Sequence, residues 1–138
     1  MAAHLPALIA CVWIGFFSAI SFMESWLKFR APGVTLNMGL AIGMLVFKNL
    51  NRVEWLFASS LAVSLTLNSF PGLYLLWCLP AGILAIQTFG TLPRLNTRLT
   101  LRLSGIDPGP SKLHLVYVAL ELAKGLSLIL FTITLLKH

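Results

Sequence analysis

Long apolar runs constrain this chain more than any other feature of its sequence. Hydrophobic residues make up 58% of the 138 residues and charged residues only 10%, whereas soluble domains carry about 25% charged residues. A helix needs about 20 mainly apolar residues to cross the hydrocarbon core of a bilayer. Four segments approach or exceed that length: 5–27, 53–70, 73–92 and 112–136. The sequence therefore predicts an all-α fold, a four-transmembrane-helix bundle that forms one integral membrane domain over residues 1–138.

The segment 34–50 lies between the first two predicted spans and is shorter than a span. Its sequence, VTLNMGLAIGMLVFKNL, is apolar and contains a GxxxG pair at Gly39 and Gly43, a spacing that lets helices approach closely. We expect a short amphipathic helix on the membrane surface, or a re-entrant helix, at this position.

Basic residues are distributed unevenly between the two sides of the predicted bundle. The connections that follow the first and third spans, with the adjoining helix ends, hold eight of the ten Lys and Arg residues: Lys28, Arg30, Lys48, Arg52, Arg94, Arg98, Arg102 and Lys112. Connections rich in Lys and Arg stay in the cytoplasm. We therefore expect a bacterial inner-membrane protein with both termini outside the cytoplasm. Because topology explains the net charge of +6, nucleic acid is not expected as a partner.

Three arginines in the second basic connection form a regular series. Arg94, Arg98 and Arg102 are four residues apart, so they share one face if this part of the connection is helical. Anionic lipid headgroups attract basic segments at the cytoplasmic surface of a membrane. We expect these arginines to bind the headgroups of membrane lipids.

The fourth predicted span carries ionisable groups inside an apolar run. His114, Tyr117, Glu121 and Lys124 fall within an arc of roughly 80° when each residue advances by about 100°. Glu121 lies about 15 Å into a hydrocarbon core about 30 Å thick. Ionisable residues at such depth are rare and commonly functional, so this face is predicted to point into the bundle.

The other spans add polar residues that can meet this face. Glu24 can pair with Lys28 at i+4, and we expect Glu54 to lie near the cytoplasmic boundary, level with Glu24 and His114. The inferred result is a polar core open to the cytoplasm. Its candidate residues are Glu24, Glu54, Gln87, His114, Tyr117, Glu121 and Lys124.

Four interpretations of this core stay open at the level of sequence. The charges can form structural pairs, Glu121 with Lys124 and Glu54 with Arg52 or another arginine, in a scaffold subunit of a membrane complex. They can hold a metal or haem, with Glu24, Glu54, His114 and Glu121 as candidate ligands, although the Glu-x-x-His signature of di-metal bundles is missing. They can orient the polar end of a hydrophobic small molecule. They can also relay protons in a small transporter, which would need a homo-oligomer to enclose a path.

Several stretches of the chain resemble a known class of small membrane proteins. CVWIGFFSAISF, ESWLKFRAPG, GLAIGMLVFKNLNRVEW, LPRLNTRL and SKLHLVYVALELAK are similar to the transmembrane-protein-205-like family of unknown function. The plan also resembles, more distantly, HemJ-type protoporphyrinogen oxidases and CopD-type copper-resistance domains. The resemblance implies a four-helix membrane protein. A HemJ-type activity would imply haem and porphyrinogen oxidation, and a CopD-type role would imply copper.

The hydrophobic-ligand interpretation is our prediction from the sequence. We expect the polar core to bind a quinone, a porphyrin or haem, or a lipid, with redox chemistry as an option. The proton-coupled transporter and the scaffold subunit are the alternatives. Cys11 and Cys78 lie at similar predicted depths, and we expect two small buried residues rather than a disulfide.

Overall fold

The chain folds as a bundle of four long helices, and a computed structural model describes residues 4–138. The first helix comprises α1 (His4–Ser18), a π-helical segment η1 (Ala19–Glu24), α2 (Ser25–Leu27) and a 3-10 turn η2 (Lys28–Arg30). The second is α3 (Leu36–Leu67). The third comprises a 3-10 turn η3 (Pro71–Leu73), α4 (Tyr74–Ile86), a second π-helical segment η4 (Gln87–Thr91) and α5 (Leu92–Leu103), and the fourth is α6 (Leu113–Leu136). Residues 4–138 contain no strand, so the all-α prediction is confirmed.

Three of these helices are long and apolar enough to cross a membrane. They are His4–Arg30, Pro71–Leu103 and Leu113–Leu136, which contain the predicted first, third and fourth spans. Among the described residues α3 is not one of them, because Lys48, Arg52 and Glu54 interrupt its apolar residues. The fold therefore supports a membrane location through three helices.

The prediction of a separate short helix at 34–50 is wrong. The structure has one continuous α3 of 32 residues, which begins after Thr35, whose side chain accepts a hydrogen bond from the backbone N–H of Met38. No proline occurs between residues 34 and 67, and Gly39 and Gly43 lie early in the helix, far from its middle. The polar residues at 48–54 are compatible with an α-helix, so nothing at 50–53 ends it. By contrast, the expectation of a helix at the start of the basic connection is confirmed by α5.

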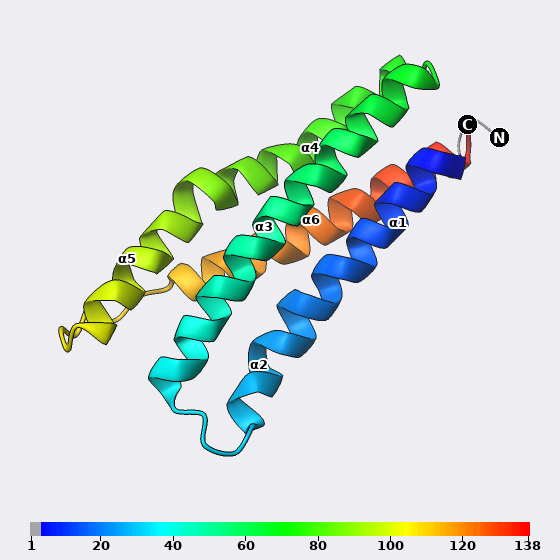
Figure 1. Cartoon of the computed structure of the whole chain (residues 1–138). Coiled ribbons are helices and arrows are strands. Elements are labelled where there is room, and N and C mark those ends of the chain that lie inside the picture. The colour runs from blue at the N-terminus through cyan, green and yellow to red at the C-terminus, as the bar shows by residue number, and fades with distance from the viewer. Residues whose placement is uncertain (1–3) are drawn as a thin grey trace.

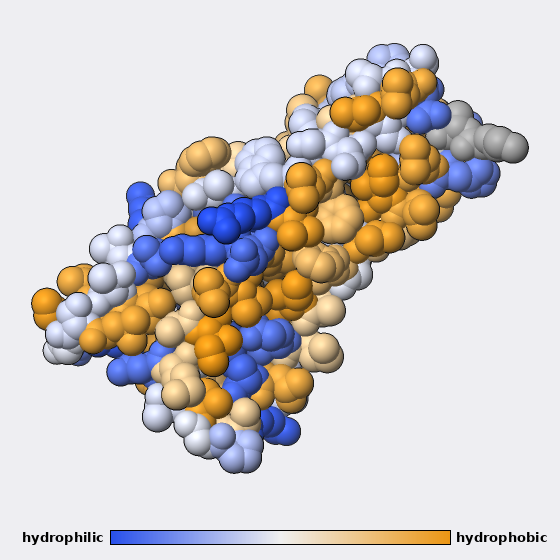
Figure 2. Space-filling view, viewed as in Figure 1, coloured by the Kyte–Doolittle hydropathy of each residue, from blue (hydrophilic) through white to orange (hydrophobic). Residues whose placement is uncertain are grey.

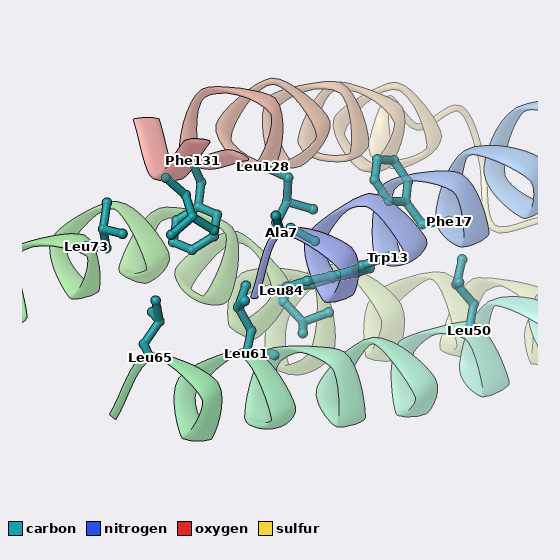
Figure 3. Close-up of a cluster of buried hydrophobic side chains, with 13 residues drawn as sticks. Ala7, Trp13, Phe17, Leu50, Leu61, Leu65, Leu73, Leu84, Leu128 and Phe131 are labelled. Carbon is teal, nitrogen blue, oxygen red and sulfur yellow. The ribbon is translucent and has the colours of Figure 1, made fainter. Parts of the chain in front are cut away.

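The four helices surround a hydrophobic core. α1 packs against α3 and α6, and α4 packs against the same two helices, so each helix has two neighbours. Figure 3 shows the core side chains between them, with Trp13 and Phe17 from α1, Leu61 from α3 and Phe131 from α6 all directed inward. Because of this packing, the inward faces of all four helices meet along the central axis of the bundle.

The two ends of the bundle differ in what they contain. In Figure 1 the beginning of α1 and the end of α6 lie at one end, and the connections α2–α3 and α5–α6 lie towards the other. The turn between α3 and α4 lies with the chain ends, because the Phe70 ring is 6.5 Å from the His138 ring. We call the end with connections 31–35 and 104–112 the basic end, since Arg30, Arg102 and Lys112 flank these connections.

The outer surface of the bundle is strongly apolar. Figure 2 shows hydrophobic side chains along the visible face, while hydrophilic side chains gather mainly over the half that contains the basic end. Exposed large hydrophobic residues occur on all four helices, among them Leu8, Leu56, Leu75, Phe89 and Leu126. Exposed apolar surface on this scale marks contact with a membrane or with other proteins.

Candidate functional site

Lys124 of α6 lies at the centre of a fully enclosed group of charges. Its side chain is 0% exposed, and its Nζ atom is 2.7 Å from Glu121 Oε1 and 2.5 Å from Glu54 Oε1. Both carboxylates are themselves buried. We call Glu54, Glu121 and Lys124 the charge cluster. It joins α3 to α6 through ion pairs in an environment of low dielectric, where such contacts are strong but each ion is costly to bury.

Neutral side chains from the first and third helices complete the bonding of the charge cluster. Trp13 Nε1 donates to Glu54 Oε1 at 3.0 Å, and Ser21 Oγ donates to Glu121 Oε2 at 2.9 Å. Gln87 bridges two members, because Nε2 donates to Glu121 at 2.6 Å and Oε1 accepts from Lys124 at 3.0 Å. All four helices therefore contribute to one polar network.

The two residues that donate to Glu121 from other helices both lie in π-helical segments. Ser21 belongs to η1 and Gln87 to η4. A π-helical turn holds more residues than an α-helical turn, and such turns inside α-helices occur frequently at functional sites. These irregular turns therefore aim a hydroxyl and an amide at the same buried carboxylate.

The charge cluster contains one more acid than base. Two carboxyl groups face one ammonium group, so the cluster is electrically neutral when one carboxyl group carries a proton. Two buried polar atoms in this region have no hydrogen-bond partner, Glu54 Oε2 and the Tyr117 hydroxyl. Unsatisfied buried polar groups are uncommon and costly, which makes this region a candidate for function as well as for structure.

Two predicted ion pairs are confirmed, and one is wrong. Glu121 pairs with Lys124, and Glu24 pairs with Lys28 at 3.4 Å. Glu54 does not pair with Arg52 but with Lys124. The continuous α3 directs Glu54 towards α6, while Arg52 is exposed and donates to Asn49 Oδ1 at 3.4 Å.

The four candidate metal ligands do not come together as a ligand set. Glu54 and Glu121 both contact Lys124, Glu24 contacts Lys28, and His114 lies at the surface. Within residues 4–138 no three His, Cys, Asp or Glu side chains are grouped in a way that could hold a metal ion. An axial haem contact from His114 alone stays a prediction.

A cavity at the basic end of the bundle is lined by four basic residues. It has a volume of about 370 Å³ and lies between α2, α3, α5 and the connection that leads into α6. Lys28, Arg98, Arg102 and His114 line it, together with apolar residues that include Phe29 and Phe47. We call it the end cavity. None of its lining residues is acidic, and Arg94 does not line it.

Two of the basic groups in the end cavity keep donors free for a ligand. Arg98 donates to the carbonyl oxygens of Pro108 and Gly109 and so holds the α5–α6 connection in place. In the described part of the chain the guanidinium group of Arg102 and the imidazole of His114 make no hydrogen bond to another side chain or to the backbone. The lining therefore combines one structural arginine with an arginine and a histidine that are open to a bound group.

Gly39 and Gly43 shape the wall of the end cavity. A Cβ atom at Gly43 would lie 2.6 Å from Lys28 Nζ, and one at Gly39 would overlap the Phe29 ring. The GxxxG pair predicted to bring helices together therefore lets the turn η2 lie directly against α3. Without these glycines Lys28 and Phe29 could not keep their places in the cavity wall.

The end cavity and the charge cluster lie one after the other along α6. His114 lines the cavity, Tyr117 follows one turn later, and Glu121 follows after another turn. The Tyr117 ring is buried, and its centroid is 5.0 Å from that of Phe47, a residue of the cavity lining. The aromatic pair therefore separates a cavity open to solvent from the enclosed charges.

Trp13 and Ser21 are residues of the charge network that were not among the predicted polar-core residues. The sequence predicted Gln87 in the polar core, but it did not place Trp13 there. A usable signal exists, because a buried tryptophan usually finds a partner for its N–H group. Trp13 is 0% exposed and uses that group for Glu54.

The fold and the site together define an all-helical bundle with an enclosed charge network and an amphiphilic end cavity. Comparison of the chain with models of protein families, with curated proteins and with solved structures found no match. The resemblance to small four-helix membrane proteins therefore stays an expectation, and function has to be argued from the site.

Proposed function

We propose that this chain is an integral membrane protein that binds an amphiphilic small molecule in the end cavity. The observation that supports this proposal is the lining of that cavity. Apolar side chains such as Phe29 and Phe47 form its walls, and basic side chains occur on several of the elements around it. Ligand sites typically combine a largely apolar lining with a few convergent polar groups.

The ligand is oriented by its polar end. Arg102 and His114 can donate to a carboxylate, a phosphate or a quinone oxygen, and charge-assisted hydrogen bonds of this kind are about twice as strong as neutral ones. The hydrocarbon part then lies against the aromatic walls. A quinone, a porphyrin and a lipid all have this combination of an apolar body and an oxygen-rich end.

Membrane insertion of all four helices is part of the proposal. Three helices have the length and composition to span a bilayer, and exposed large hydrophobic residues also occur along α3, at Leu45, Leu56, Val63 and Leu67. The basic end then faces the cytoplasm and both termini lie outside it, because Lys and Arg accumulate on the cytoplasmic side.

Ligand binding can be tested by native mass spectrometry of the protein released from mild detergent. We expect one amphiphile of defined mass to accompany the purified protein, and a Soret band if that molecule is a porphyrin. The substitution Arg102→Gln should weaken binding by about tenfold, the effect expected from the loss of one charge-assisted hydrogen bond. Arg94→Gln is the matched control, since Arg94 lies on the same helix but outside the cavity. An equal loss of amphiphile binding in both variants would contradict the assignment of the ligand to the end cavity.

The orientation of the bundle can be tested by cysteine labelling in intact bacterial cells. Cys11 and Cys78, which we expected to be buried, are exposed and unpaired, so both can be replaced by Ala without loss of a disulfide. In that background a cysteine added after His138 should react with a membrane-impermeant maleimide, and Ser104→Cys at the basic end should not. If only the Ser104→Cys variant were labelled, the basic end would lie outside the cytoplasm and the proposed orientation would be wrong.

A further inference from the structure

A second cavity lies beside α3 and shares no residue with the end cavity. It has a volume of about 310 Å³ and lies between α3, η4 and the start of α5. Its polar lining consists of Lys48, Asn51, Arg52, Trp55, Thr88 and Asn96. We call it the side cavity. None of the interpretations of the polar core uses these residues as a site.

Asn51 supplies a buried donor that the protein itself does not satisfy. Its side chain is only 5% exposed, and its Oδ1 atom accepts a hydrogen bond from Thr88 Oγ1 at 2.9 Å. Its Nδ2 atom is buried and has no hydrogen-bond partner. An unsatisfied buried amide costs stability, and the residue that carries it belongs to the lining of the side cavity.

The charged groups of the side cavity are all of one sign. Lys48 and Arg52 are one turn apart on α3 and both are exposed. The ion pairs of the described residues use Lys28 and Lys124, so neither Lys48 nor Arg52 is neutralised by a carboxylate. No acidic residue lines the cavity. The site therefore offers cationic and neutral donors to an anion.

We propose that the side cavity binds a phosphate group, carried by an anionic lipid of the surrounding membrane. Guanidinium groups bind the oxygens of a phosphate in a bidentate manner, and an ammonium group adds a compact charge. Asn51, a polar residue of the same lining, lies between Lys48 and Arg52 on α3. Trp55, whose indole N–H donates to Thr88 Oγ1 at 2.9 Å, is of the type that lies at membrane interfaces, where lipid phosphates occur.

This proposal shares only membrane insertion with the proposed function, because the two cavities have separate linings. Its test is lipid titration of the purified full chain, followed by native mass spectrometry. We expect phosphatidylglycerol to bind in one copy that is weakened in Arg52→Gln and unchanged in Arg102→Gln. The affinity of that copy should fall by about tenfold in Lys48→Gln or Arg52→Gln, and Arg94→Gln should leave it unchanged.

Asn51→Asp is the second variant, because it keeps the shape of the side chain and replaces the free donor by a negative charge. We expect it to abolish binding of this lipid copy while the helical circular dichroism spectrum stays unchanged. Inorganic phosphate, titrated against the lipid, distinguishes the source of the group. Competition at millimolar concentration would indicate a site for free phosphate, and no competition supports a lipid.

The proposal is overturned if phosphatidylglycerol binds equally to the wild type, Arg52→Gln and Asn51→Asp, or if no lipid copy is retained by the folded wild type. In Arg52→Gln, weakened binding of the lipid copy with an amphiphile still bound in the end cavity would support the side cavity as a separate site. Undiminished binding of both molecules in that variant would reject the side cavity and leave the proposed function intact, whereas a wild type that binds the lipid copy but no amphiphile would reject the proposed function alone.

Discussion

Lys124→Met should destabilise the bundle by about 3–5 kcal/mol, the cost of removing one partner from a buried ion pair. The substitution keeps an apolar stem of similar length but leaves Glu54 and Glu121 facing each other without a counter-charge. Both carboxylates are enclosed by protein, so water cannot compensate for the loss. The free energy of unfolding in detergent, or the midpoint of thermal unfolding, measures the effect.

Neutralising the whole charge cluster is the matched control for this prediction. The triple variant Glu54→Gln, Glu121→Gln and Lys124→Met has no unpaired charge, and replacement of a complete buried ion network is often neutral for stability. We expect it to recover most of the stability lost in Lys124→Met. If Lys124→Met were as stable as the wild type, the cluster would not hold the helices together.

The triple variant also separates the competing roles of the charge cluster. A folded triple variant that keeps both the amphiphile in the end cavity and the proton uptake of the wild type would assign the cluster to structure. A folded triple variant that loses binding would link the cluster to the cavity through Tyr117, which lies between them along α6. Loss of proton uptake in proteoliposomes, with binding kept, would favour the transporter interpretation.

The inward face of α6 could be predicted because helical periodicity is a local property. Tyr117, Glu121 and Lys124 are buried as expected, and Lys124 pairs with Glu121 three residues earlier. The residues needed for this prediction lie within one helix, so no knowledge of the neighbouring helices was required. His114, at the start of the same face, is exposed and lines the end cavity, because the helices separate at the basic end.

Contacts between helices were harder to predict, since they depend on rotations that one sequence does not encode locally. The partner of Glu54 follows from the continuity of α3, which sequence reasoning divided into two segments. The donors Ser21 and Gln87 reach Glu121 from π-helical segments, and neither AISFME nor QTFGT carries a recognisable signal for a π-helix. The side cavity was missed because Lys48 and Arg52 were interpreted as topology signals, and Arg52 also as a partner of Glu54, while Asn51 was not considered as part of a site.

Gly43→Leu should abolish amphiphile binding in the end cavity, with a loss of about 100-fold or more, because it both fills and distorts the site. Even a Cβ atom at this position would lie 2.6 Å from Lys28 Nζ, so the ammonium group must leave its place beside Glu24. The rest of the leucine side chain then occupies space that the apolar part of the ligand needs. A loss of about 1.4 kcal/mol in binding free energy lowers the affinity about tenfold. Two such losses are therefore enough for the expected effect.

Gly15→Leu is the control for this substitution, because a Cβ atom at Gly15 would meet no other atom within 4 Å. Both changes replace a helical glycine with a better helix former, so any general gain in helix stability is shared. Affinity measured by native mass spectrometry should fall only in Gly43→Leu. Gly15→Leu should unfold at or above the wild-type temperature, and Gly43→Leu should keep the helical circular dichroism spectrum of the wild type. Undiminished binding by Gly43→Leu would place the ligand elsewhere. The side cavity, which Gly43 does not line, should keep its lipid in both variants, so that the two binding sites respond independently to one change in α3.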